Sequence, residues 1–153
     1  MSSLEEIKKL RAKTKAGVMD CRRALETCGN DLKKAEAWLW EKGIKSADKR
    51  AEKETACGLV DAYTHGEGKI VAVVELCCET DFVARTDDFK KLVHDLSMQV
   101  AALNPKDVNE LLSQPWIKDE KVKIEELVKE LSGKTGENIK IRRIFRIELG
   151  EKF

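Results

Sequence analysis

The sequence predicts an α+β protein in which helices cover one face of a small antiparallel sheet. Two observations predict this fold class. Apolar residues recur at helical spacing through the first 43 of the 153 residues, and strand-like segments follow only later. The second part then reads strand, strand, helix, helix, strand, an order that needs no parallel crossover. We therefore expect a helical module at residues 1–43, a linker helix at 44–54 and an α+β core domain at 55–153.

Three short helices are expected in the N-terminal module. Their apolar residues lie three or four positions apart, which places them on one face of each helix. These residues are Leu4, Ile7 and Leu10, then Cys21, Ala24, Leu25 and Cys28, then Leu32, Ala35, Trp38 and Leu39. Gly29 and Gly43 stand where they would end the second and third helices. Residues 44–54 are rich in Lys, Ala and Glu, which favours a solvated helix without a core of its own.

Three strands are expected in the core. Residues 59–64 and 69–78 are joined by a Gly-rich turn and should pair as an antiparallel hairpin. Residues 138–149 alternate apolar with charged side chains, apart from Arg143, which breaks the pattern. Arg142, Arg143 and Arg146 are expected to make the outer face of the last strand basic.

The core helices lie between the second and third strands. Thr86 is a suitable N-cap for a helix that carries an apolar stripe from Phe89 to Leu103 and stops at Asn104. One helical turn is expected around residues 108–112, before Pro115. A further helix is expected at residues 120–131.

Composition excludes several classes of function. The 29 basic and 28 acidic residues leave a net charge of +1, which argues against a generally polybasic binder of nucleic acids or membranes. No apolar run approaches the ~20 residues of a membrane span. The charged N-terminus lacks an apolar signal region. Five scattered cysteines without a CxxC pair indicate reduced thiols, so a cytoplasmic location is expected.

Signatures of catalysis, nucleotide binding and metal binding are absent from the sequence. We therefore expect no cofactor, no metal and no covalent chemistry. His65 lies in a turn and His94 on the polar side of a helix, and neither has a nucleophile beside it in the sequence. The vicinal pair Cys77-Cys78 lies in a strand, where neighbouring side chains point to opposite faces. These two residues are interpreted as buried small hydrophobes rather than as a redox couple.

Two segments place apolar residues where a loop or turn would usually be polar. Val18 and Met19 follow Gly17 between the first two helices, and they either cap the three-helix core or form an exposed patch for a partner. Capping is slightly favoured on spacing alone. Phe82 follows Asp81 between a strand and a helix. It either tucks into its own core, the default for a single aromatic, or projects from a rigid platform.

Three motifs give the sequence a specific resemblance. They are residues 7–11 (IKKLR) with 16–21 (AGVMDC) and 24–25, residues 75–85 (ELCCETDFVAR), and residues 136–139 (GENI) with Arg142 and Arg143. In this order they closely resemble the bacterial elongation factor Ts family, and the resemblance runs over nearly the whole chain.

The resemblance implies a guanine nucleotide exchange factor for elongation factor Tu. It implies that the N-terminal module is similar to a ubiquitin-associated domain and docks on the GTPase domain of Tu through Arg11, Val18 and Met19. It also implies that a turn acts on the magnesium site of Tu. The residues that match this turn are Thr80, Asp81, Phe82 and Val83. The protein itself would need no bound nucleotide or metal.

Two departures from the family pattern bear on these expectations. Lys15 stands where the family usually has Gly, so the conformation of its loop can differ. Long family members carry a second core subdomain and a helical insertion, and the short segment between Leu103 and Asn138 leaves no room for either. A second copy of the chain could supply what is missing, and a homodimer through residues 55–153 is slightly favoured because a three-stranded sheet leaves edges and a half-covered face.

Two other classes of function compete with this assignment. The N-terminal module alone would suit a ubiquitin-associated-type adaptor that binds peptides or ubiquitin-like folds, but the second and third motifs argue against it. An RNA-binding module using Arg142, Arg143 and Arg146 would show steep salt dependence. A solvated face is favoured over a phosphate site for these arginines.

Overall fold

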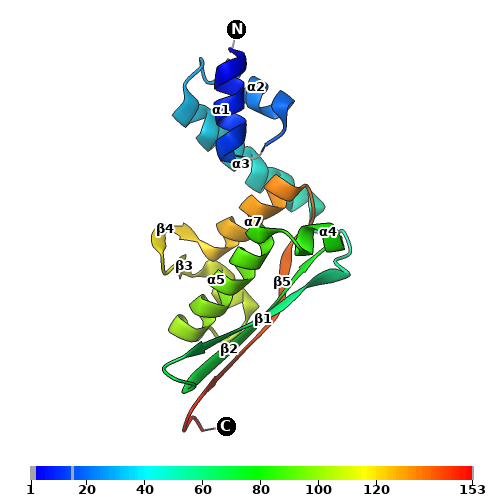
Figure 1. Cartoon of the computed structure of the whole chain (residues 1–153). Helices are drawn as coiled ribbons and strands as arrows, with labels where there is room; N and C mark the ends of the chain where they lie inside the picture. Colours follow the sequence, from blue (N-terminus) through cyan, green and yellow to red (C-terminus); the bar gives the residue numbers. More distant parts are fainter. Residues whose placement is uncertain (1–2, 15, 153) are drawn as a thin grey trace.

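The computed structural model describes residues 3–14 and 16–152, and the side chains of residues 44–49 fall outside that description. The expectation about Lys15 therefore lies outside the described residues. An N-terminal group of helices stands at one end of a core built from a sheet and helices (Figure 1). The predicted α+β class and the order of helices before sheet are confirmed.

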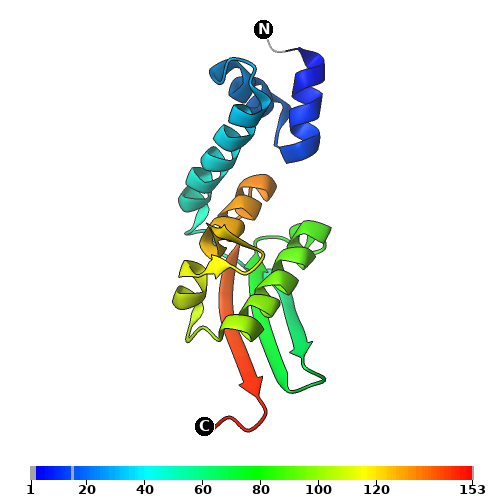
Figure 2. The ribbon, with the colours of Figure 1, turned by 90° about the vertical axis from the view of Figure 1, so that its left-hand side faces the viewer.

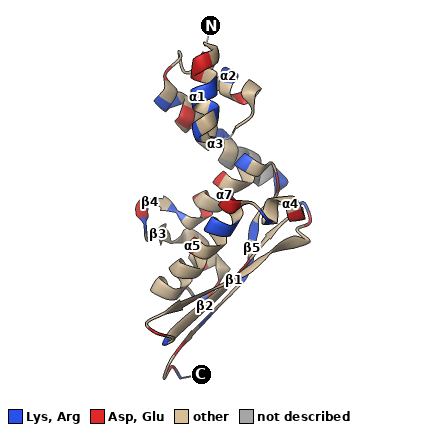
Figure 3. Ribbon diagram, in the orientation of Figure 1, with Lys and Arg blue, Asp and Glu red and all other residues tan. Residues whose placement is uncertain are grey.

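The N-terminal module consists of α1 (Leu4–Thr14), α2 (Val18–Thr27) and the first part of α3 (Leu32–Arg50). Its small core is formed by side chains from all three helices: Ile7, Leu10, Cys21, Ala24, Leu25, Ala35 and Leu39. Ser3 caps α1, since its hydroxyl accepts from the Glu6 amide and the Glu6 carboxylate accepts from the Ser3 amide. The remaining faces carry mixed charges (Figure 3).

Helix α3 does not end at Gly43, as expected, but continues to Arg50. Residues 44–50 are therefore its last turns rather than a separate linker helix. Gly43 has a different role, because α3 crosses α7 (Ile124–Thr135) at this point. A Cβ added to Gly133 of α7 would lie 2.7 Å from the Cα of Gly43, so the two backbones approach more closely than larger residues would allow.

The sheet contains β1 (Cys57–His65), β2 (Ile70–Cys78) and β5 (Lys140–Glu148), in the order β1-β2-β5. Both pairings are antiparallel, as predicted. Helices α5 (Asp87–Leu103), α6 (Val108–Ser113) and α7 lie on one side of the sheet (Figure 2). The covered face of β2 presents Ala72, Val74, Leu76 and Cys78 to the core.

A β-bulge in β5 reverses the expected orientation of its second half. Glu75 pairs with Arg143 and Leu76 with Ile141, which leaves Arg142 as the extra residue. Beyond the bulge, Ile144 packs against the core and Arg146 turns under α5, where its Nε donates to the carbonyl oxygen of Ala101 at 3.0 Å.

The expected basic outer face of β5 is therefore wrong beyond the bulge. Arg146 lies on the covered side of the sheet, and Phe145 and Ile147 occupy the open side, 56% and 65% exposed. One inserted residue moves every following side chain to the other face.

The region before α7 also differs from expectation. Residues 120–123 belong to a strand rather than to the predicted helix, because β3 (Pro115–Trp116) and β4 (Asp119–Lys123) form a small hairpin. The buried side chain of Gln99 anchors this hairpin from α5. Its amide nitrogen donates to the carbonyl oxygen of Pro115, and its amide oxygen accepts from the Ile117 amide. The predicted helical turn before Pro115 is confirmed as α6.

Candidate partner interface

A short helix, α4 (Asp81–Ala84), stands where β2 leaves the sheet, at the end of the core nearest the N-terminal helices (Figure 1). The sequence indicated only a tight connection here. Thr80 is its N-cap and accepts from the Val83 amide. The C-terminal half of the turn is anchored, because Val83 and Ala84 are buried in the core cluster.

Phe82 projects from α4 into solvent with 86% of its surface exposed. Of the two interpretations left open by the sequence, the core position is therefore wrong. Asp81 beside it is also exposed, and its carboxylate lies 2.5 Å from the guanidinium of Arg85. The tip of the turn is thus an apolar ring next to a carboxylate whose charge is largely balanced by its neighbour.

A single carboxylate holds the base of this turn. Glu137 Oε1 accepts from the amides of Glu79 and Thr80, at 3.1 and 2.9 Å. Its Oε2 accepts from the Thr80 hydroxyl at 2.6 Å. In return, Glu79 Oε1 accepts from the Asn138 amide at 2.7 Å. These reciprocal bonds join two segments far apart in the sequence, and charged acceptors make each bond stronger than a neutral one.

The loop that carries Glu137 is itself fixed by helix α7. Gly136 ends α7 in the left-handed conformation, at φ 74°. Asn138 is buried, and its side-chain nitrogen Nδ2 donates to the carbonyl oxygens of Ala51 and Lys53, at 3.3 and 2.7 Å. The chain that leaves α3 is therefore tied to the same loop as the Thr80 turn. The sequence showed the GENI motif but gave no sign that it would clamp this turn.

The residues expected to dock a partner lie on the N-terminal module. Val18 and Met19 begin α2 and are 47% and 65% exposed, while Arg11 is exposed near the end of α1. The favoured interpretation that they cap the three-helix core is wrong. Cys21 and its neighbours on α2 fill that core instead.

The arginines of β5 do not form a continuous basic patch. Glu75 pairs with both Arg142 and Arg143, at 3.7 and 2.6 Å, and Arg146 lies on the opposite face. The geometry therefore lacks the row of unpaired cations that a phosphate backbone would require.

All five cysteines are free thiols, and Cys77 and Cys78 are buried as expected. Burial is the main cause that raises the pKa of Cys78 to about 11, and the nearby Glu137 carboxylate adds to it. Burial also raises the pKa values of Cys21 and Cys77. In the part of the chain that the structure describes, no group of acidic, His and Cys side chains is placed to hold a metal ion. None of the described helices is long and apolar enough to cross a membrane.

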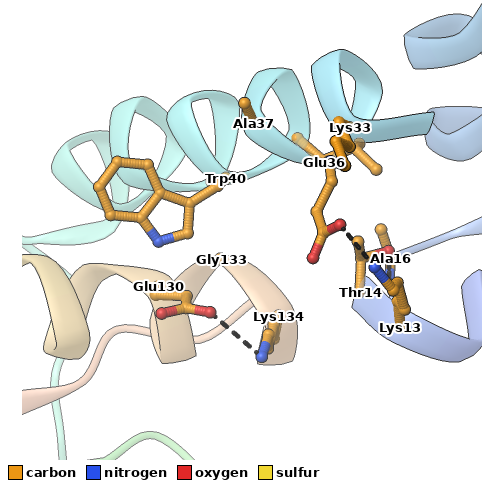
Figure 4. Close-up of a pocket in the computed structure, with 12 residues that line it drawn as sticks. Lys13, Thr14, Ala16, Lys33, Glu36, Ala37, Trp40, Glu130, Gly133 and Lys134 are labelled. Atoms are coloured by element: carbon orange, nitrogen blue, oxygen red, sulfur yellow. Dashed lines mark hydrogen bonds and ion pairs between the residues drawn. The ribbon is translucent and has the colours of Figure 1, made fainter. Parts of the chain in front are cut away.

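A cleft of about 450 Å³ separates the N-terminal module from α7 (Figure 4). Trp40 and Ala37 line it from α3, and Gly133 lies at the crossing with α7. Its two carboxylates are already paired, since Glu36 accepts from Lys13 at 3.2 Å and Glu130 lies 3.3 Å from Lys134. The cleft is thus a seam between two parts of the fold, away from the Thr80 turn.

Comparison with known proteins places these features in context. A family model described as elongation factor TS matches residues 79–153, a region that begins at the Thr80 turn. A protein from Synechococcus sp. (strain JA-2-3B'a(2-13)) named elongation factor Ts is 40% identical, and the match covers 95% of this chain and 74% of that protein. Proteins of the same name from Coprothermobacter proteolyticus and Herpetosiphon aurantiacus are 39% and 37% identical, and 96% and 98% of their lengths are covered.

The alignments are longer than the chain itself. They span 190–193 positions, against 153 residues here. These relatives therefore contain a segment that has no counterpart in this chain.

Proposed function

Because the chain belongs to the elongation factor Ts family, a family of translation elongation factors, we propose that it promotes GDP release from elongation factor Tu by inserting the Thr80 turn at the magnesium site of Tu. The observation that carries this proposal is the position of Phe82, a bulky apolar side chain held in solvent on a clamped turn. An aromatic side chain exposed in this way has no stabilising role in its own fold, which favours a role in contact with a partner.

The energetic basis of exchange is linkage. A factor that binds nucleotide-free Tu more tightly than Tu·GDP must weaken GDP binding by the same ratio. Displacing Mg²⁺ supplies much of that difference, because the ion neutralises phosphate charge. The exchange factor then leaves when a new nucleotide and its ion return. No covalent step is required.

The rigidity of the turn favours insertion over mere contact. The three bonds to Glu137 and the burial of Val83 hold the turn in one conformation before binding, so little conformational entropy is lost on insertion. The Asp81–Arg85 pair limits the charge that Phe82 carries with it into the partner. We expect Asp81 to contribute less than Phe82.

Docking through the N-terminal module supplies affinity. Val18 and Met19 form an exposed apolar pair beside the basic end of α1, which carries Arg11. Such a patch suits an amphipathic surface on the GTPase domain of Tu. We propose that residues 1–54 provide affinity for Tu and that residues 55–153 act on its nucleotide site.

We also propose that two copies associate through the open face of the sheet. The open face carries the apolar residues Val60, Ala62, Val71, Val73, Phe145 and Ile147 in adjacent cross-strand rows. Charged residues are few along β1 and β2 (Figure 3). Self-association covers an apolar face of this kind, and a two-fold axis makes it self-complementary. The segment that the relatives have and this chain lacks leaves room for a second copy.

The test is the rate at which a fluorescent GDP analogue leaves Tu. We expect the wild-type chain to accelerate release, and Phe82→Ala to lose most of that acceleration. Leu103→Ala is the matched control, because it truncates an exposed apolar side chain at the end of α5, far from the Thr80 turn. A loss of equal size in both variants would refute the role of Phe82.

A further inference from the structure

Cys57 and Cys78 face each other across the first two strands. They are Cα partners in the antiparallel register of β1 and β2. Residues directly opposed in this way have Cα atoms ~4.5–5.5 Å apart, within the ~4.4–6.8 Å that a disulfide bridges. Both side chains lie on the helix-covered face, since Cys78 belongs to the core cluster and Cys57 packs against it.

The backbone beside this pair is unusually close. A Cβ added to Gly58 would overlap the carbonyl oxygen of Leu76 and lie 2.8 Å from the Cα of Cys77. Only glycine permits that approach of β1 to β2. Gly58 is also the residue opposite Cys77, so Cys77 has no thiol across the strand. Its side chain points to the opposite face from that of Cys78, which excludes a vicinal bond without distortion of the strand.

We propose that Cys57 and Cys78 form a thiol–disulfide couple that closes an intramolecular disulfide when the protein meets a small disulfide such as oxidised glutathione. The two thiols differ in access: Cys57 is partly exposed, whereas Cys78 is fully buried. Cys57 is therefore the attacking group and Cys78 the resolving group.

The chemistry is a two-electron exchange. The Cys57 thiolate attacks one sulfur of oxidised glutathione, which breaks the S–S bond and releases one glutathione thiolate. The Cys78 thiolate then attacks the Cys57 sulfur, forms the internal bond and releases the second glutathione. The two protein thiols lose two electrons and two protons, and the reagent is reduced to two thiols.

The resolving step is the slow one at neutral pH. Burial raises the pKa of Cys78 to about 11, so little of its thiolate is present. The rate of closure should therefore rise about tenfold for each unit of pH while the pH stays below that pKa. In the reduced protein, Cys78 Sγ also donates to the carbonyl oxygen of Thr80 at 3.1 Å, and closure removes this donor from the base of the Thr80 turn.

The experiment uses the full chain with Cys28→Ser, because Cys28 is partly exposed and would take up glutathione independently. The reduced protein is incubated with oxidised glutathione until its mass no longer changes, so that the slow resolving step is complete, and is then quenched with acid and digested without reductant. We expect a peptide in which Cys57 is linked to Cys78, and a protein that has lost two hydrogen atoms and retains no glutathione.

Three further variants distinguish the roles of the thiols. Cys78→Ser should accumulate glutathione on Cys57, Cys57→Ser should form no internal bond, and Cys77→Ser should behave as the parent does. A link that contains Cys77, or glutathione retained on Cys57 in the parent, would overturn the proposal. The peptide map of the parent decides the matter even if a variant fails to fold.

Discussion

At the scale of single residues, we expect that the side chain of Phe82 does not contribute to the stability of the fold. Its side chain is 86% exposed, whereas Val83 next to it is buried. We expect Phe82→Ala to leave the melting temperature nearly unchanged, because truncating a core Phe would cost ~3–5 kcal/mol and no such burial exists here. A thermal melt followed by circular dichroism measures this. Val83→Ala is the control on the same helix and should lower the melting temperature.

Glu137 is the residue that fixes the conformation of the Thr80 turn. Glu137→Ala removes the acceptor for two amides and one hydroxyl, and we expect a loss of about 1–3 kcal/mol in stability together with slower GDP release. Glu137→Gln keeps one carbonyl oxygen, so its stability and its rate of GDP release should lie between those of wild type and Glu137→Ala. Chemical denaturation and nucleotide release on the same samples measure both effects. Normal exchange by Glu137→Ala would contradict the positioning role.

The sequence was a better guide to which residues are unusual than to what they contact. Phe82 and Val18 stood out as apolar residues in polar surroundings, and both are exposed. Glu137 and Thr80 are 57 positions apart in the sequence, and no local pattern encodes their contacts. Local chemistry can indicate an exposed side chain, but only the tertiary fold brings its support into place.

At the scale of elements, the crossing of α3 and α7 determines how the N-terminal module is attached. A Cβ on Gly133 would lie 2.7 Å from backbone of Gly43, whereas a Cβ on Gly43 would meet Gly133 at 3.7 Å, an ordinary contact. We expect Gly133→Ala to destabilise the protein by about 1–3 kcal/mol through overpacking. Gly43→Ala should be neutral or stabilising by up to ~1 kcal/mol, because alanine favours helix. Equal effects of the two substitutions on thermal unfolding would contradict this crossing.

The helices and strands that sequence patterns predicted wrongly share one physical cause, which is contact with other parts of the fold. Gly43 was expected to end a helix. It instead lies inside α3, where the absence of a side chain lets α7 approach closely. Residues 120–123 were expected to be helical, yet the buried Gln99 holds the hairpin of β3 and β4. The bulge at Arg142 reversed the faces of β5. Helices and strands with a strong apolar stripe, such as α5, were predicted correctly because their own pattern suffices.

At the scale of the whole molecule, two separate apolar cores support the division into module and core domain. We expect a shortened chain that starts at Lys53 to fold, because the larger core lies wholly within the remaining residues. It should bind Tu weakly and release GDP only at high concentration. Titration of Tu with both chains measures the difference. Equal affinity would refute the proposal that residues 1–54 provide affinity.

The open face of the sheet predicts a homodimer. Light scattering should give about twice the 17.3 kDa of one chain at micromolar concentration. Ile147→Lys places a charge on the open face, on its edge strand β5, and should shift the mass to that of a monomer. Leu103→Lys, on α5, is the control and should leave the mass unchanged. A wild-type mass of one chain that stays constant on tenfold concentration would contradict the dimer.

The role of Phe82 is tested most directly by the release of a fluorescent GDP analogue from Tu, measured with wild-type protein and with Phe82→Ala. We expect Phe82→Ala to remain folded and to bind Tu, but to accelerate GDP release at least about tenfold less than wild type. This loss corresponds to ~1.4 kcal/mol or more in the barrier to release. Release at the wild-type rate by the folded variant would contradict the proposal that Phe82 acts on the magnesium site.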